Sequence, residues 1–309
     1  MHYSVLLDES VTALDIKPNG LYIDGTFGRG GHTSKILEKL TDQGQLIVFD
    51  KDPQAINYAK EKFGNDSRVR IVHKPFSNMY QFCLANGLLG NVDGILLDLG
   101  VSSPQLDQAE RGFSFMQDGP LDMRMDTTSG IPASEALKLL SESELANIFK
   151  VYGEERFSKK IAAYIKADIA KGIEFNTTLE LANLIKRVIH TKEKKHPATR
   201  CFQALRIYVN DELGEVEKTI ADAENILKAS GKLVVISFHS LEDRIVKKYM
   251  TKMVNGKTDS DLQVPRGLPI LEDVPKKMKW VVKMLKADGS ELSENVRSRS
   301  AILRAVEKL

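Results

Sequence analysis

The chain has 309 residues, of which 42% are apolar and 28% charged, as in a globular protein that buries its own core. This composition excludes a disordered, collagen-like or disulfide-stabilised chain, and no apolar run approaches the roughly 18 residues of a membrane-spanning helix. The net charge is only +2, but residues 150–210 hold 13 Lys and Arg against 6 Asp and Glu, which favours either a polyanionic partner or solvated helix faces.

The first half of the sequence alternates short apolar segments with amphipathic ones. Four strands and two helices are predicted, the strands at 21–24, 45–50, 69–73 and 92–99 and the helices at 33–40 and 53–63. The strand at 92–99 is almost wholly apolar, as expected for a strand that is buried on both faces. The alternation predicts an α/β fold with a mostly parallel, doubly wound sheet.

A long stretch separates the fourth strand from the next clear one, at 232–238. A crossover between parallel strands needs only about a dozen residues, so the stretch must contain additional structure. Ser141-x-x-Glu144 and Thr177-x-x-Glu180 are capping-box patterns that open helices, and apolar residues recur at helical spacing between them. The sequence therefore predicts an inserted helical domain.

The expected boundaries divide the chain into two domains, an inserted one at 105–210 and a main one formed by 1–104 and 211–309. Around the strand at 232–238, the second part of the main domain has helices predicted at 211–229 and 240–252. Two final strands are predicted at 280–285 and 301–306 and are expected to pair as a hairpin.

A glycine-rich segment, Asp24 to His32, follows the first strand. Glycines there allow a tight turn and a close approach of the backbone to a ligand. The dinucleotide fingerprint G-x-G-x-x-G fails, because Thr33 occupies its last glycine position. The spacing Asp-x-x-x-Gly-x-Gly instead resembles the first motif of Rossmann-like S-adenosylmethionine methyltransferases. A purely structural turn is the alternative.

Further candidate site residues stand at or after the ends of the later strands. Asp50 lies 20 residues beyond Gly30, where a carboxylate can accept both ribose hydroxyls of an adenosine, whereas Asp52 is interpreted as a helix cap. Phe76 either lies against an adenine or packs in the core. Asp98 ends the apolar fourth strand, at the sheet edge where ligands of such folds bind, and is expected to be functional.

These motifs, with others in one order along nearly the whole chain, resemble the RsmH (MraW) family of ribosomal RNA methyltransferases. The resembling segments are 23–32, 49–56, 93–105, 111–126, 152–156, 196–200, 236–243 and 297–304. The resemblance implies a Rossmann-like class I methyltransferase fold and the cofactor S-adenosylmethionine. It also implies methylation of the exocyclic 4-amino group of a cytidine in the decoding region of 16S ribosomal RNA.

The resemblance further implies which residues bind the cofactor and which partner the protein binds. Carried over position by position, the cofactor-binding residues are Gly30, Gly31, His32, Asp50, Phe76, Asp98 and Gln105. The insert is expected to hold RNA of the small ribosomal subunit, in agreement with the basic charge of residues 150–210. No required protein partner is evident, and the sequence leaves open whether the protein forms a homodimer.

Asp98 is also the predicted catalytic residue. The lone pair of a cytosine amine is delocalised into the ring, so attack requires a hydrogen-bond acceptor that orients the amine and later helps to remove a proton. A carboxylate at the strand end is the first choice for this acceptor. Its use for both cofactor and target amine is a hypothesis.

Several residues are candidates for contact with RNA. Phe113 and Phe115 could stack on bases, or their loop could pack as a hydrophobic element between the domains. The candidate phosphate contacts are Lys192, Lys194, Lys195 and Arg200. His239 is expected to fix the turn before the helix that starts near Ser240 rather than to act as a base.

Three alternatives remain open at this point: a methyltransferase that acts on DNA or another RNA, an NAD-dependent oxidoreductase, and a non-catalytic RNA-binding scaffold. Metal catalysis has no support, because the histidines form no metal-binding pair and Cys83 and Cys201 lie far apart. The isolated cysteines and the N-terminal segment, which lacks the features of a signal peptide, predict a cytoplasmic protein.

Overall fold

The computed structural model describes residues 4–189, 196–256 and 275–309. The chain forms two compact units, unit 1 from residues 1–100 and 213–309 and unit 2 from residues 101–212. Each unit has hydrophobic clusters of its own. Within the described ranges, no helix combines the length and the apolar character needed to cross a membrane.

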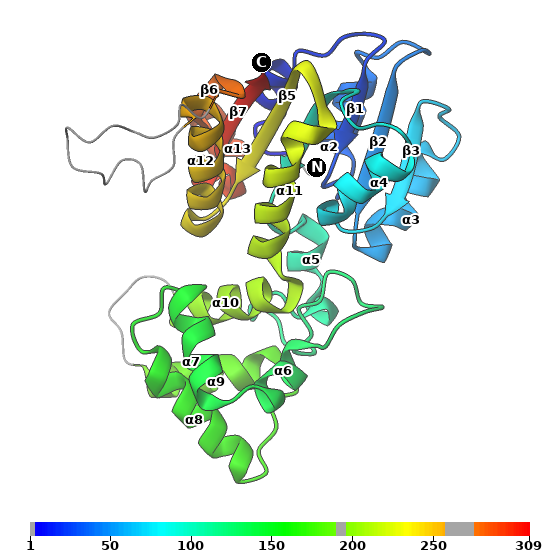
Figure 1. Ribbon diagram of the computed structural model, residues 1–309. Coiled ribbons are helices and arrows are strands. Elements are labelled where there is room, and N and C mark those ends of the chain that lie inside the picture. Colours follow the sequence, from blue (N-terminus) through cyan, green and yellow to red (C-terminus); the bar gives the residue numbers. More distant parts are fainter. Residues whose placement is uncertain (1–3, 190–195, 257–274) are drawn as a thin grey trace, which may run out of the picture. The chain divides into compact units, whose positions relative to one another are not determined.

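Unit 1 is built on a seven-stranded sheet (Figure 1). Its strands are β1 (Leu21–Asp24), β2 (Gln45–Asp50), β3 (Val69–His73), β4 (Val92–Asp98), β5 (Leu227–Ser237), β6 (Met278–Lys286) and β7 (Ile302–Lys308). The strand order is β3-β2-β1-β4-β5-β7-β6, in which β1 to β5 run parallel and β7 runs antiparallel to β5 and to β6. The predicted α/β fold with a mostly parallel sheet is confirmed.

Helices cover both faces of this sheet. One face packs against α4 (Met79–Ala85), α11 (Glu212–Ile226) and α12 (Ser240–Asn255), and the other against α1 (Leu7–Leu14), α2 (Gly31–Leu37) and α3 (Pro53–Phe63). Side chains of β4 alternate between the faces, with Ile95 and Leu97 in one cluster and Leu96 in the other. The apolar run in β4 follows from this double burial.

Local sequence signals explain where several of these helices begin. The Asp52 carboxylate accepts a hydrogen bond from the Gln54 N–H at 2.9 Å, and Pro53 occupies the first helical position of α3, so the predicted cap is confirmed. His239 caps α12, because its Nδ1 accepts the Glu242 N–H at 3.4 Å. The expectation that His239 fixes this turn is therefore confirmed.

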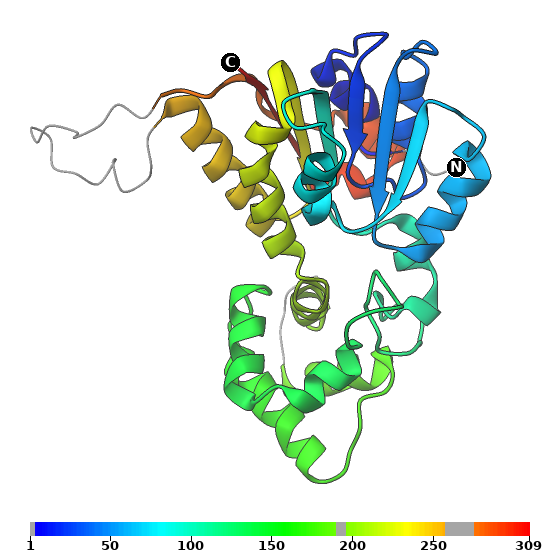
Figure 2. The same ribbon diagram turned by 45° about the vertical axis from the view of Figure 1, so that its right-hand side comes forward.

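Unit 2 is helical (Figure 2). Its elements are α5 (Ser103–Asp107), η2 (Ala109–Arg111), α6 (Ala133–Leu139), α7 (Glu142–Val151), α8 (Ser158–Ala170), α9 (Thr178–Val188) and α10 (Thr199–Asn210). Ser141 and Thr177 are N-caps with the predicted capping boxes, so these two helix starts are confirmed. Buried side chains of α6 to α10 form one core.

Three further short helices lie in unit 1, namely η1 (Phe76–Asn78), α13 (Gly289–Glu294) and η3 (Val296–Ser300). The predicted hairpin is correct in pairing β6 with β7, but β7 also pairs with β5 and so lies inside the sheet. The predicted fifth strand starts too late, because β5 begins at Leu227, which pairs with Val92. Lys228 and Ser230, the latter with φ of 65°, interrupt the apolar pattern that would reveal this start.

Candidate active site

Three aspartates end three neighbouring parallel strands of unit 1. Asp50 ends β2, Asp24 ends β1 and Asp98 ends β4, and β1 lies between the other two strands. Because carboxyl ends of parallel strands meet at one edge of the sheet, the three carboxylates share that edge. In open α/β sheets this edge is where ligands bind.

Asp24 holds the loop between β1 and α2. Its Oδ1 accepts the Thr26 N–H at 3.1 Å and its Oδ2 accepts the Thr33 hydroxyl at 2.7 Å. Burial raises the pKa of Asp24 to about 6, although both hydrogen bonds oppose the rise. Thr33, the residue that breaks the dinucleotide fingerprint, thus anchors the loop to Asp24.

Each carboxylate oxygen of Asp50 accepts a hydrogen bond from one backbone N–H group. Its Oδ2 accepts the Gly28 N–H at 2.8 Å, and its Oδ1 accepts the Asp52 N–H at 2.9 Å. Burial raises the pKa of this carboxyl to about 6, against the effect of the two hydrogen bonds. A carboxylate offers about four lone pairs, so each oxygen can accept one further hydrogen bond.

Asp98 has the least compensated carboxylate of the three. Its backbone N–H donates to the Thr26 hydroxyl at 2.7 Å, which fixes the end of β4 against the glycine-rich loop. Burial raises the pKa of Asp98 well above its ordinary value, and the carboxylates of Asp24, Glu242 and Glu291 raise it further. Its Oδ1 has no hydrogen-bond partner among the described residues.

His32 lies beside Asp98 as a neutral ring. Only 5% of the His32 side chain is exposed, and its Nδ1 lies 3.6 Å from Asp98 Oδ2. Burial lowers the pKa of His32 to about 4, so the imidazole is uncharged near neutral pH and does not neutralise Asp98. The Nε2 atom finds no hydrogen-bond partner in the described parts of the chain.

The N-terminal segment packs against the glycine-rich loop. This contact could not be predicted from the sequence. A Cβ atom at Gly31 would lie 2.0 Å from the Ser4 hydroxyl oxygen, so only glycine allows this approach. The Leu6 N–H donates to Glu291 Oε1 at 2.8 Å, and Leu6 adopts a φ of 49°, which is uncommon outside glycine. Contacts between residues so far apart leave no local signal in the sequence.

Phe76 starts the short helix η1 and lies at the border of the core. It is partly buried against the cluster that includes Met79 and Leu97. A Cβ at Gly25 would meet Leu97 at 2.5 Å and Phe76 at 3.3 Å, so this glycine lets both side chains approach the start of the loop. Phe76 as a whole is intermediate in burial, between the core and the solvent.

Gln105 is the one predicted cofactor-binding residue that belongs to unit 2. Its Oε1 accepts the Ser102 N–H at 2.9 Å as part of the capping box that opens α5. Gly30, Gly31, His32, Asp50, Phe76 and Asp98 all belong to unit 1. Unit 1 thus brings together the glycine-rich loop and the residues that end or follow its strands.

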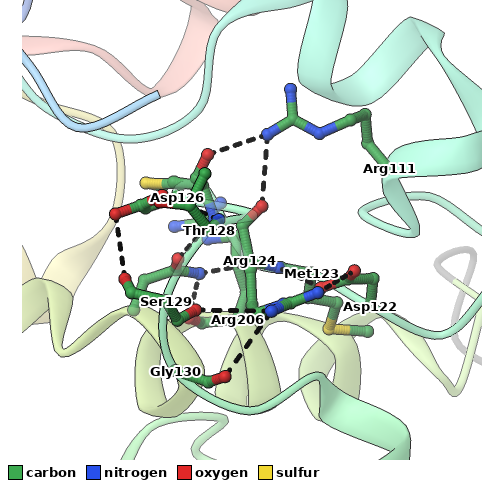
Figure 3. A network of polar contacts seen from close by, with 11 residues as sticks. Arg111, Asp122, Met123, Arg124, Asp126, Thr128, Ser129, Gly130 and Arg206 are labelled. Atoms are coloured by element: carbon green, nitrogen blue, oxygen red, sulfur yellow. Dashed lines mark hydrogen bonds and ion pairs between the residues drawn. The ribbon is translucent and has the colours of Figure 1, made fainter. Parts of the chain in front are cut away.

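Buried polar groups of unit 2 form a different kind of network (Figure 3). The Asn210 amide donates to the carbonyls of Met123 and Arg206 at 2.8 and 2.9 Å, and its oxygen accepts the Met125 N–H at 2.7 Å. Arg111 donates to the carbonyls of Arg124 and Met125 at 3.1 and 3.0 Å. These contacts fix the irregular segment before α6 and have the character of a structural network.

The expectation that Phe113 and Phe115 present rings for base stacking is not supported. Phe113 is 7% exposed, and the Phe115 ring lies 4.7 Å from the rings of both His196 and Phe202 within unit 2. The aromatic loop therefore packs inside its own unit. Lys192, Lys194 and Lys195 lie outside the described residues, and Arg200 is partly exposed.

The arrangement suits a ligand that carries positive charge and hydroxyl groups. Three converging carboxylates have no Lys or Arg ion-pair partner within the described residues, and the glycine-rich loop stands beside them. A doubly wound sheet with such a loop after its first strand defines an α/β enzyme of the nucleoside-cofactor-binding type.

Comparison with known proteins identifies the family. The chain belongs to the MraW methylase family, whose model matches residues 1–309. It is 57% identical over 309 residues to a protein from Francisella philomiragia named ribosomal RNA small subunit methyltransferase H, with 100% of this chain and 99% of the relative covered. A relative with the same name from Francisella tularensis subsp. mediasiatica is 56% identical, with 100% of both chains covered.

Proposed function

We propose that the protein transfers the methyl group of S-adenosylmethionine to the exocyclic 4-amino group of a cytidine in the decoding region of 16S ribosomal RNA. The observation that carries this proposal is the set of strand-end carboxylates without cationic partners among the described residues, in a chain of the MraW methylase family. The names of the two Francisella relatives support RNA of the small ribosomal subunit as the acceptor.

The charges at the strand ends fit this cofactor. S-adenosylmethionine carries a sulfonium, an ammonium group and two ribose hydroxyls, which suit Asp98 and Asp50. The unpartnered Oδ1 of Asp98 and its raised pKa are what a carboxylate shows when its cationic partner is the ligand. The NAD-dependent alternative is disfavoured because Thr33 breaks the dinucleotide fingerprint of the glycine-rich loop.

The same geometry supports the remaining cofactor-binding roles proposed for unit 1. Asp50 accepts the ribose hydroxyls with the lone pairs that its two backbone hydrogen bonds leave open. Gly30 and Gly31 let the backbone approach the ligand, and Phe76 offers an apolar ring to the adenine. His32 adds a hydrogen-bonding group without a second positive charge. Gln105 completes the proposed set.

Asp98 is proposed to act on the target amine as well. When bound, the cofactor supplies a methyl group already activated by its positive sulfur. The Asp98 carboxylate accepts a hydrogen bond from the amine, directs the amine lone pair towards attack, and accepts a proton after transfer. A neighbouring cation lowers the pKa of Asp98 and keeps this carboxylate ionised for the role.

We assign methyl transfer to the domain formed by 1–104 and 211–309 and RNA recognition to the domain at 105–210. The excess of Lys and Arg in residues 150–210, which form the larger part of the second domain, supports this division. We also place the enzyme in the cytoplasm, in agreement with its two free, buried cysteines, Cys83 and Cys201.

The test incubates the protein with methyl-labelled S-adenosylmethionine and three unmodified acceptors: small ribosomal subunits, protein-free 16S RNA and duplex DNA. Labelled 4-methylcytidine in subunits or in 16S RNA is the expected result. Label confined to DNA, or cofactor binding without any transfer, would overturn the proposed substrate.

A further inference from the structure

We propose that one face of unit 2, formed by α8 and α9, is a stacking surface for unpaired RNA bases. The inference rests on the proposed function and specifies how the RNA would be held. The face consists of residues of the two helices or directly before or after α8, namely Arg156, Phe157, Lys160, Tyr164, Asp168, Lys171 and Arg187.

Two aromatic rings on this face are exposed to solvent. Phe157 is 40% exposed and Tyr164 is 46% exposed, although most aromatic side chains of unit 2 pack into its core. The two residues are seven positions apart, which on an α-helix places them about 20° apart around the axis and about 10 Å apart along it. They therefore form one row, with a separation of about three stacked bases.

Cations flank both rings. The Arg156 guanidinium lies 5.5 Å from the centre of the Phe157 ring. Lys160 Nζ lies 3.1 Å from the Val188 carbonyl, and Arg187 Nη2 lies 2.9 Å from Asp168 Oδ2, so Lys160 and Asp168 both meet the last turn of α9. Tyr164 falls between these two contact points on α8, and α8 and α9 lie side by side in Figure 1.

The face has a net positive charge. Asp168 is its one acidic member, and it contacts both Arg187 and Lys171, the latter at 3.3 Å. Arg187 and Lys171 are 66% and 68% exposed, so their charges stay accessible to a partner. One carboxylate among the cations Arg156, Lys160, Lys171 and Arg187 leaves an excess of positive charge beside the two rings.

Exposed rings between cations match the chemistry of unpaired RNA. Bases stack on aromatic side chains, and phosphates pair with Lys and Arg, whereas a continuous duplex hides the faces of its bases. A second copy of this chain is a poor occupant, because two such faces would repel each other. The observations thus favour a single-stranded or looped segment of RNA.

The experiment measures RNA binding by the full-length protein with Tyr164→Ala and Phe157→Ala. Tyr208→Ala serves as the matched control, because Tyr208 is a 36% exposed aromatic residue of the same unit on α10. The probes are protein-free 16S RNA, a short single-stranded RNA and a duplex RNA of equal length. Each stacking variant is expected to weaken single-strand and 16S RNA binding about tenfold, with the cofactor affinity unchanged.

The salt dependence tests the cations separately. The double variant Lys160→Ala/Arg187→Ala is expected to lower the slope of log affinity against log salt by about 1.4, or about 0.7 for each phosphate that is no longer neutralised. Unchanged RNA affinity in both stacking variants, or an equal decrease with Tyr208→Ala, would overturn the proposal. A wild-type protein that binds RNA through this face but transfers no methyl group would refute the proposed function alone.

Discussion

Unit 1 and unit 2 both bury polar groups, but they compensate them differently. In unit 2, Asn210 satisfies three backbone groups, and Arg206 forms an ion pair with Glu212 at 2.8 Å. In unit 1, the strand-end carboxylate of Asp98 has a raised pKa, an Oδ1 without a hydrogen-bond partner and no Lys or Arg ion-pair partner within the described residues. Paired polar groups hold a fold together, whereas uncompensated ones mark a place where a ligand completes the charge balance.

The largest effect is expected from replacing the least compensated carboxylate, that of Asp98. We expect Asp98→Asn to lower kcat about 100- to 1000-fold at saturating cofactor, because the amine loses its proton acceptor. Asp93→Asn is the control from the same strand, since Asp93 forms ion pairs with Lys17 and Lys228 and lies away from the strand end. Near-normal turnover in Asp98→Asn, with only the cofactor affinity reduced, would refute the acceptor role.

The corresponding change in unit 2 should affect stability and not cofactor binding. Asn210→Ala leaves the Met125 N–H and the Met123 carbonyl without their buried partner, which should lower the free energy of unfolding by about 2–3 kcal/mol. Urea denaturation measures this, with the exposed Asn183→Ala as control. An Asn210→Ala protein with native stability would show that the network is not structural.

A smaller effect is expected for Asp50→Asn. The asparagine side chain would place an NH2 donor against the N–H of Gly28 or Asp52, which now donates to the carboxylate. The charge-assisted hydrogen bonds to the ribose would also be lost. The cofactor Kd should rise about tenfold, with kcat at saturating cofactor nearly unchanged. Calorimetric titration measures the Kd, and Asp52→Asn, which keeps a good helix cap, should bind as the wild type does.

The smallest effect concerns stability and pH. The folded-state pKa of Asp24, about 6, exceeds its ordinary value of 3.8, so this carboxyl stabilises the fold in its protonated form and loses that contribution as pH rises through 6. Asp24→Asn should therefore raise the free energy of unfolding by about 1 kcal/mol at pH 7 and leave it unchanged near pH 4. Urea denaturation at the two pH values measures the difference. A gain of equal size at both would exclude the carboxyl as its source.

Much of unit 1 could be predicted from the sequence, because its signals are local. Apolar runs show β1 to β4, and Asp52 with Pro53 marks the start of α3. Helix α1 is absent from the predicted elements although Leu7, Val11 and Leu14 recur at helical spacing, because its eight residues make only about two turns and give a short pattern. The start of β5 is hidden in the sequence because polar residues interrupt it.

The candidate site also combines residues that the sequence predicts with contacts that it does not. Asp50 and Asp98 could be chosen from the sequence, since each ends a recognisable strand. The approach of Ser4 to Gly31 and the bond from Leu6 to Glu291 could not, because they join residues that are distant in the sequence. For Phe113 and Phe115 the sequence left base stacking and hydrophobic packing equally open, since an aromatic loop in a sequence carries no sign of whether its rings are buried.

The most direct test of the account is the number of protons released when S-adenosylmethionine binds. Calorimetric titrations at pH 7 in two buffers of different ionisation enthalpy give this number. We expect release of protons by the wild type, because a bound cation lowers the pKa of Asp98, and a smaller release by Asp98→Asn. Binding without proton release, or with proton uptake, would contradict the claim that the strand-end carboxylates of unit 1 receive a cationic cofactor.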